Sequence, residues 1–91
     1  MRGLFRNAIA YNQPLDKWDV TSVTDLSVLF YNASFFNQAL NSWNVSSVTK
    51  MEGTFFFAKS FNNALDEWDV SSVTSMWTLF QNASVFNQPI G

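Results

Sequence analysis

Three acidic or amide side chains recur at one position of the sequence, 25 residues apart, and could act together as a binding surface. They are Asp19, Asn44 and Asp69, and a hydroxyl residue follows each of them at Thr21, Ser46 and Ser71. If successive repeats pair as strands, equivalent side chains lie about 4.8 Å apart. Two carboxylates and one amide offer too few oxygens for a calcium ion. We therefore expect no metal or other cofactor, and interpret these six residues as a candidate protein-binding face.

The residue types that most often carry catalysis are missing. The chain has no Cys and no His, which excludes thiol nucleophiles, disulfides and the commonest general base. The carboxylates Asp16, Asp66 and Glu67 lie just before the repeated Trp, but nothing in the sequence indicates the cleft and raised pKa that a glycosidase pair needs. We predict that the protein is not an enzyme.

Several aromatic residues depart from the repeat and are further binding candidates. Trp77 stands where the other repeats have Arg2, Ser27 and Glu52, so we expect it on the solvent side of its element. Exposed aromatic side chains often mark an interface, although packing against a neighbouring loop explains such residues equally well. Additional aromatics replace small or polar residues at Tyr31, Phe35, Phe56 and Phe57.

An asparagine also recurs in every repeat, and we expect it to be structural. A buried Asn stacked on its equivalents can bond its side-chain amide to the backbone of the next repeat, and buried polar groups are normally satisfied in this way. The members of this ladder are Asn12, Asn37, Asn62 and Asn87.

The elements that must position these residues follow a strict 25-residue period, marked by Trp18, Trp43 and Trp68. A short fixed period predicts repeats that stack on one another. We expect a single segment of about 3.6 repeats, because both ends of the chain fall inside a repeat and no polar capping segment is evident. This interpretation predicts a piece of a longer array, with repeats at 1–25, 26–50, 51–75 and 76–91.

Each repeat shows a strand-like and then a helix-like pattern. Trp68 and Val70 would point inward from a short strand, with Asp69 between them pointing outward. Leu26, Leu29, Phe30 and Ala33 have the i, i+3, i+4, i+7 spacing of one helix face. Before this pattern stands a residue suited to a helix N-cap, namely Thr24, Thr49 or Thr74. The predicted fold class is therefore α/β: a right-handed, leucine-rich-repeat-like solenoid with one short parallel strand and one short helix in each repeat.

The composition of the chain restricts the kinds of partner that we expect it to bind. The formal net charge is −2, the isoelectric point is about 4.6, and only 13% of residues are charged. The five basic residues are scattered, so we expect no nucleic-acid binding. No apolar run reaches the length of a membrane span, and no signal peptide is recognisable at the start, so we expect no membrane insertion by this segment.

The run from Phe61 to Met76, with variants at 11–26 and 36–51, resembles the BspA-type surface-protein repeat of mycoplasmas and other bacteria. The resemblance covers essentially the whole chain. It implies an exported or cell-surface array, grouped with the leucine-rich repeats and found in adhesins, and it supplies no catalytic residues.

Together these observations favour a non-catalytic recognition or adhesion module of a cell-surface repeat protein, with an extracellular or host surface protein as its partner. The alternative is a structural building block that stacks end to end with other copies of itself or within a larger assembly. An ice-binding surface is disfavoured because the hydroxyl ladders are mixed with Asp and Lys.

Overall fold

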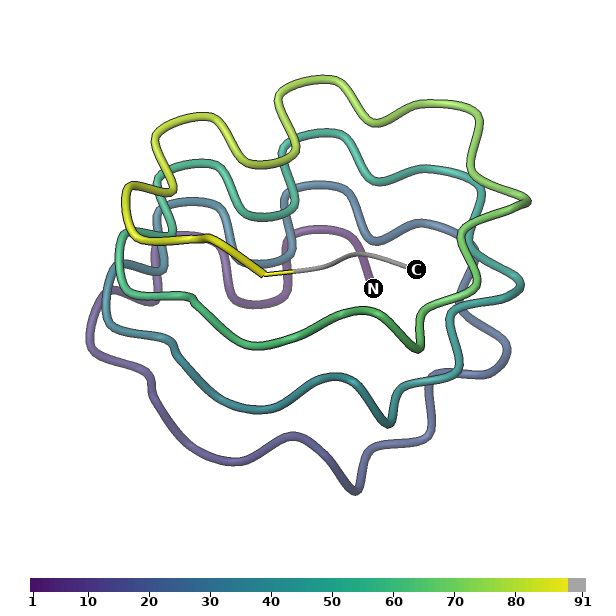
Figure 1. The fold of residues 1–91 in the computed structure, drawn as a ribbon, viewed down its shortest axis with the longest axis horizontal. Coiled ribbons are helices and arrows are strands. Elements are labelled where there is room, and N and C mark those ends of the chain that lie inside the picture. The colour runs from purple at the N-terminus through teal and green to yellow at the C-terminus, as the bar shows by residue number, and fades with distance from the viewer. Residues whose placement is uncertain (89–91) are drawn as a thin grey trace.

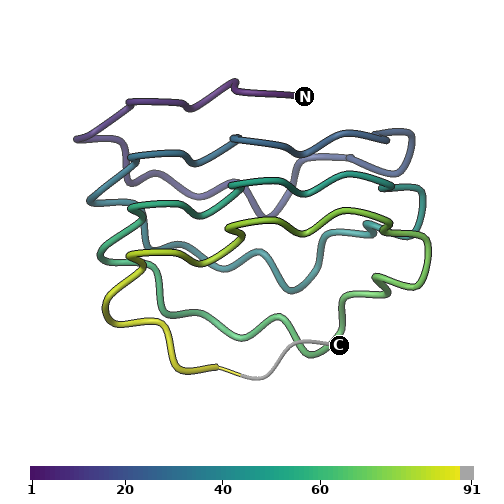
Figure 2. The same ribbon diagram turned by 90° about the horizontal axis from the view of Figure 1, so that it is seen from above.

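The backbone of residues 1–88, which the computed structural model describes, winds in successive loops that lie one on another (Figure 1 and Figure 2). We call residues 1–25, 26–50, 51–75 and 76–88 the first to fourth coils. Backbone hydrogen bonds join each coil to the next: the Val28 and Phe30 amides donate to the Glu52 and Thr54 carbonyl oxygens at 2.9 Å. The molecule measures 28 × 27 × 24 Å along its principal axes.

The predicted α/β solenoid of leucine-rich-repeat type is wrong. Residues 1–88 contain no helix. They also contain no strand longer than a single bridged residue, and the parallel bridges join Asp25 to Lys50 and Lys50 to Ser75. The coils are instead chains of tight turns, which form a compact body.

Left-handed residues explain why the helix does not form. Val28 has a φ of 51° and Asn32 a φ of 58°, and residues in this region cannot continue a right-handed helix. The amides of Leu29, Tyr31 and Ala33 donate to carbonyls three residues earlier, closing consecutive turns. Val28 and Asn32 are at the third position of such turns, where a type II turn requires positive φ. The equivalent positions of the other coils are also left-handed: Gly3, Asn7, Gly53, Phe57, Thr78 and Asn82.

The predicted strands are also replaced by turns. The amides of Trp68 and Val73 donate to the Leu65 and Val70 carbonyls at 3.1 and 3.0 Å. The predicted N-cap residue Thr49 starts no helix. Its amide and hydroxyl both donate to the Thr24 carbonyl of the preceding coil, at 2.8 and 3.2 Å.

Two columns of aromatic rings run through the interior, across the coils. In one column, Phe30 stacks on Phe5 and on Phe55, with 5.6 Å between ring centroids in both cases. In the other, Phe36 stacks on Phe61 at 6.1 Å, and the columns touch where Phe30 meets Phe36 at 4.2 Å. Offset stacking at these distances adds to the burial of the rings. The columns are completed by Phe80 in the first, and by Tyr11 and Phe86 in the second.

The few polar groups inside this core are satisfied. Thr54 is fully buried and its hydroxyl donates to the Leu26 carbonyl at 3.0 Å. Ser27 is also fully buried, and its hydroxyl oxygen accepts the Glu52 amide at 3.2 Å. Within residues 1–88, no buried side-chain nitrogen or oxygen lacks a hydrogen-bond partner, as expected for a specific packed core. No helix in the same range is long and apolar enough to cross a membrane.

Candidate functional site

The candidate protein-binding face predicted from Asp19, Asn44 and Asp69, which we call the Asp/Asn face, consists of short turns held by side-chain hydrogen bonds. The Asp19 carboxylate accepts the Thr21 amide at 3.0 Å and the Thr21 hydroxyl at 2.7 Å. Asn44 accepts the Ser46 amide and hydroxyl in the same way, at 3.1 and 2.7 Å. In the third coil, Asp69 accepts the Ser71 amide at 3.0 Å. All six side chains are exposed, but their oxygens hold local turns.

These turns stabilise the charged form of the two acids. The hydrogen bonds from Thr21 lower the pKa of Asp19, and those from Ser71 lower the pKa of Asp69. Hydrogen bonding to a carboxylate favours its ionised form. No group of three or more acidic residues within residues 1–88 lies close enough together to hold a metal ion.

The Asn ladder joins the coils at the surface. The Asn12 side-chain oxygen accepts the backbone amide of Asn37 at 2.9 Å, and the Asn37 side-chain oxygen accepts the backbone amide of Asn62 at 2.9 Å. The Asn62 oxygen accepts the Asn87 amide at 3.0 Å. The four residues are exposed rather than buried. The oxygens of Asn12, Asn37 and Asn62 each also accept a second donor, which is the side-chain amide of Gln38, Asn63 and Gln88 respectively.

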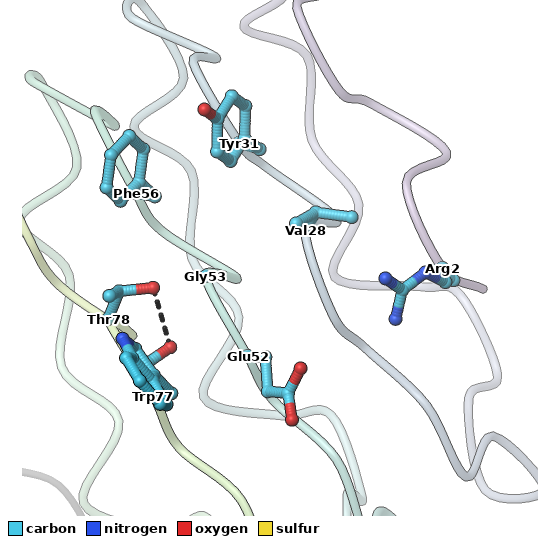
Figure 3. A pocket seen from close by; sticks show the side chains of 8 residues that line it. All are labelled: Arg2, Val28, Tyr31, Glu52, Gly53, Phe56, Trp77 and Thr78. Carbon is cyan, nitrogen blue, oxygen red and sulfur yellow. Dashed lines mark hydrogen bonds between the residues drawn. The ribbon is translucent and has the colours of Figure 1, made fainter.

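Trp77 lies at a groove that crosses the coils (Figure 3). Its side chain is 76% exposed, and the groove has a volume of about 260 Å³. Figure 3 shows two rows of side chains with a floor between them. One row contains Tyr31 and Phe56, the facing row contains Arg2, Glu52 and Trp77, and the floor is made by Val28, Gly53 and Thr78.

The floor of the groove consists of the left-handed positions. Val28, Gly53 and Thr78 have φ values of 51°, 62° and 54°. A Cβ placed on Gly53 would lie 3.4 Å from Val28 Cγ1 and 3.5 Å from Thr78 Oγ1. The absence of a side chain at Gly53 therefore leaves a notch between its two neighbours.

The aromatic row is a short surface stack. The Tyr31 and Phe56 rings are 4.8 Å apart and inclined by only 7°. The Arg6 guanidinium carbon lies 5.0 Å from the centroid of the Tyr31 ring, within the range of a cation–π interaction. The row therefore already accommodates one cation on an aromatic face.

Of the two charged side chains on the facing row, Arg2 has an oppositely charged partner and Glu52 has none among the described residues. Arg2 forms an ion pair with Asp25, with 3.6 Å between its guanidinium nitrogen and the carboxylate oxygen. Burial acts to raise the pKa of Asp25, but the Ser27 hydrogen bonds and the Arg2 charge outweigh it and lower that pKa. Glu52 is exposed, and its carboxylate accepts the Ser75 hydroxyl at 2.6 Å. No ion pair involves Glu52 within residues 1–88.

Comparison with known proteins places the sequence in a family. The sequence model described as "Mycoplasma protein of unknown function, DUF285" matches residues 1–91. The chain belongs to the DUF285 family. No curated protein and no solved structure matches the sequence. Membership of DUF285 supplies no activity, and the family description names neither the BspA-type nor the leucine-rich repeats.

In this DUF285 chain the sequence singled out only part of the groove. Trp77, Tyr31 and Phe56 attract attention as aromatic departures from the repeat, but Glu52 and Gly53 do not. The signal for Gly53 was the glycine itself, since Gly3 occupies the equivalent position 50 residues earlier and glycine commonly marks positive φ.

Replacing Thr21 with Val tests the turn at Asp19. We expect the pKa of Asp19 to rise toward its ordinary value, because Val has the shape of Thr but no hydroxyl to donate. The rise should be partial, since the residue 21 amide still donates. Asp19 contributes stability at neutral pH that is lost as the pH falls through its lowered folded-state pKa, and this contribution should shrink in the variant.

Carboxyl ¹³C chemical shifts followed over a pH titration measure this effect. Asp69 is the internal reference, because its own turn is untouched by the substitution. An Asp19 titration curve that is the same in both proteins would contradict the assigned role of the Thr21 hydroxyl.

Proposed function

We propose that this chain is a non-catalytic recognition module of a cell-surface or secreted protein, and that it binds an extracellular or host surface protein through the Trp77 groove. The observation that carries the proposal is the 76% exposure of Trp77 beside the stacked Tyr31 and Phe56. Exposing an indole to water is unfavourable, and Trp, Tyr and Arg dominate the binding energy of protein interfaces.

Two further observations support recognition through this surface. One side-chain oxygen of each of Asp19, Asn44 and Asp69 is already used to hold a local turn, whereas the Trp77 ring of the groove is largely exposed. The resemblance of the sequence to BspA-type surface repeats favours a cell-surface location and an adhesive role.

A binding assay against immobilised fibronectin, laminin and collagen tests this function with the full chain. We expect Trp77→Ala to weaken binding by about 30-fold or more, the effect of losing a hot-spot side chain of about 2 kcal/mol. Trp77 is mostly exposed, so the variant should retain its fold.

Two control sets locate the binding surface. Phe35→Ala removes another exposed aromatic, which is 61% exposed and does not line the groove, and should bind normally. Asp19→Ala and Asp69→Ala should also bind normally. Loss of binding in the Asp variants together with normal binding of Trp77→Ala would contradict the groove and favour the Asp/Asn face.

A second candidate function, a building block that stacks with other copies of itself, is favoured by a different observation. Side chains equivalent to core residues are partly exposed in the first and fourth coils: Leu4, Trp18 and Met76 are 57%, 42% and 40% exposed. Sedimentation equilibrium across concentrations separates the two functions. A mass that stays monomeric supports recognition, whereas concentration-dependent growth with no matrix binding supports assembly.

A further inference from the structure

The Trp77 groove carries one negative charge that its surroundings do not neutralise. The Arg2 charge is engaged by Asp25 at 3.6 Å, so these two charges offset each other. The Glu52 carboxylate accepts only a neutral hydroxyl, from Ser75, and has no cationic partner within the described residues. A ligand that brings a positive charge to Glu52 therefore gains an attraction that a neutral ligand does not.

The aromatic side chains of the groove are suited to the same kind of ligand. Phe56 and Trp77 stand on opposite sides of the floor at Thr78 (Figure 3). Aromatic faces attract cations electrostatically, and Trp is the strongest of them. The surface of this chain already shows the interaction twice, with Arg6 at 5.0 Å from the Tyr31 ring and Lys59 at 5.8 Å from the Phe57 ring.

The size of the groove limits what can enter it. Its volume of about 260 Å³ lies below the range of roughly 300–1,000 Å³ that is typical of sites for drug-sized ligands and cofactors. The notch at Gly53 is bordered by Val28 and Thr78 at methyl-contact distances. A single long side chain, with an apolar stem over the notch and a charged end at Glu52, fits this shape.

We infer that the groove binds one Arg or Lys side chain from a basic segment of the protein partner. The inference rests on the recognition function proposed above and specifies its ligand. Trp77 and Phe56 contact the stem and the cation, and Glu52 supplies the opposite charge. The negative net charge of the chain, −2, adds a weak general attraction for a basic partner.

Titration of the ¹⁵N-labelled full chain with a capped glycine–glycine–arginine–glycine–glycine peptide tests this inference by NMR. We expect the Trp77 indole and the Gly53 amide signals to shift with a dissociation constant in the millimolar range. The same peptide with citrulline in place of arginine, which has nearly the same shape but no charge, should bind markedly more weakly.

Glu52→Gln is the decisive variant. Glutamine keeps an oxygen that can accept the Ser75 hydroxyl, so the local structure should be retained. We expect the arginine peptide to bind about two- to fivefold more weakly to this variant, as the loss of one exposed charge interaction predicts. Glu67→Gln is the matched control, because Glu67 is also exposed but does not line the groove. The affinity of this variant for the arginine peptide should equal that of the unchanged protein.

The outcomes separate this inference from the proposed function. Equal binding of the citrulline and arginine peptides, or an unchanged affinity in Glu52→Gln, would overturn the cation site even if matrix binding still depended on Trp77. Tighter binding of choline than of the arginine peptide would also overturn it, because a quaternary-ammonium headgroup would then be the better occupant. If Trp77→Ala bound the matrix proteins as tightly as the unchanged protein, while the unchanged protein still bound the arginine peptide, only the proposed function would be overturned.

Discussion

Replacing Phe30 with Ala should lower the free energy of unfolding by about 3–5 kcal/mol, the cost of truncating a fully buried aromatic ring. Phe30 is 0% exposed. Its ring stacks on Phe5 and Phe55 in its own column and on Phe36 in the neighbouring column. Few neighbours can move into the space, because these rings are held in place by the coils above and below. The loss is a large share of the 5–15 kcal/mol that stabilises a typical domain.

Urea unfolding followed by circular dichroism measures this loss, with Phe35→Ala as the matched control. The control makes the same truncation, Phe to Ala, at a residue that is 61% exposed. Its free energy of unfolding should lie within about 0.5 kcal/mol of that of the unchanged protein, as is usual for surface substitutions. Similar midpoints for the two variants would show that the aromatic columns are not the core of the fold.

The same column shows how far the sequence predicts the structure. The apolar residues at Leu26, Leu29, Phe30 and Ala33 are all fully buried, so their spacing identifies an inward face. It does not identify the element that carries them, because three consecutive turns place residues on one side much as a short helix does. The distinction lies in where the amides donate, and Val28 and Phe30 donate to the next coil.

The left-handed positions contained a signal that periodicity does not use. Asn7, Asn32 and Asn82 occupy one left-handed position and Gly3 and Gly53 the other, and Asn and Gly are the residues that adopt this conformation at least cost. Taken together they argue against a helix in each repeat. Val28, Phe57 and Thr78 conceal the pattern, because bulky and β-branched residues rarely have positive φ. The amides of Val28 and Phe57 donate to the next coil, at 2.9 and 3.0 Å, which favours this conformation at those two positions.

The groove depends on this same backbone geometry, which is why the sequence did not predict it. Helix phase placed Trp77 toward solvent, without indicating which residues lie across from it. The opposite row, with Tyr31 and Phe56, is separated from Trp77 by the left-handed floor. Glu52 and Trp77 occupy the same position of adjacent repeats, so the period alone places them in one row. The row across the floor, with Tyr31 and Phe56, could be assigned to the same site only once the turns were known.

Replacing Trp43 with Phe should lower the free energy of unfolding by about 1–3 kcal/mol, because it removes one hydrogen bond between coils, worth about 0.5–1.5 kcal/mol, and leaves a small cavity where the five-membered part of the indole was packed. The Trp43 side chain is 2% exposed, and its indole N–H donates to the Leu15 carbonyl of the preceding coil at 2.8 Å. Trp68 donates to Leu40 in the same way, also at 2.8 Å. Phe retains the six-membered ring but cannot donate. Within residues 1–88, the Leu15 carbonyl then keeps only the Trp18 amide of its own coil, at 3.1 Å, and the hydrogen bond between the coils is lost.

The repeat supplies the control for this prediction within the same chain. Trp18 occupies the equivalent position in the first coil but is 42% exposed, and no indole hydrogen bond from it is formed within residues 1–88. Water can therefore solvate the Trp18 indole, and Trp18→Phe should change the free energy of unfolding much less than Trp43→Phe. Equal losses in the two variants would mean that ring size, and not the hydrogen bond between coils, determines the contribution of this Trp position. A larger loss at Trp43 is expected because its ring is buried and its indole N–H donates to the preceding coil, whereas the Trp18 ring is partly exposed.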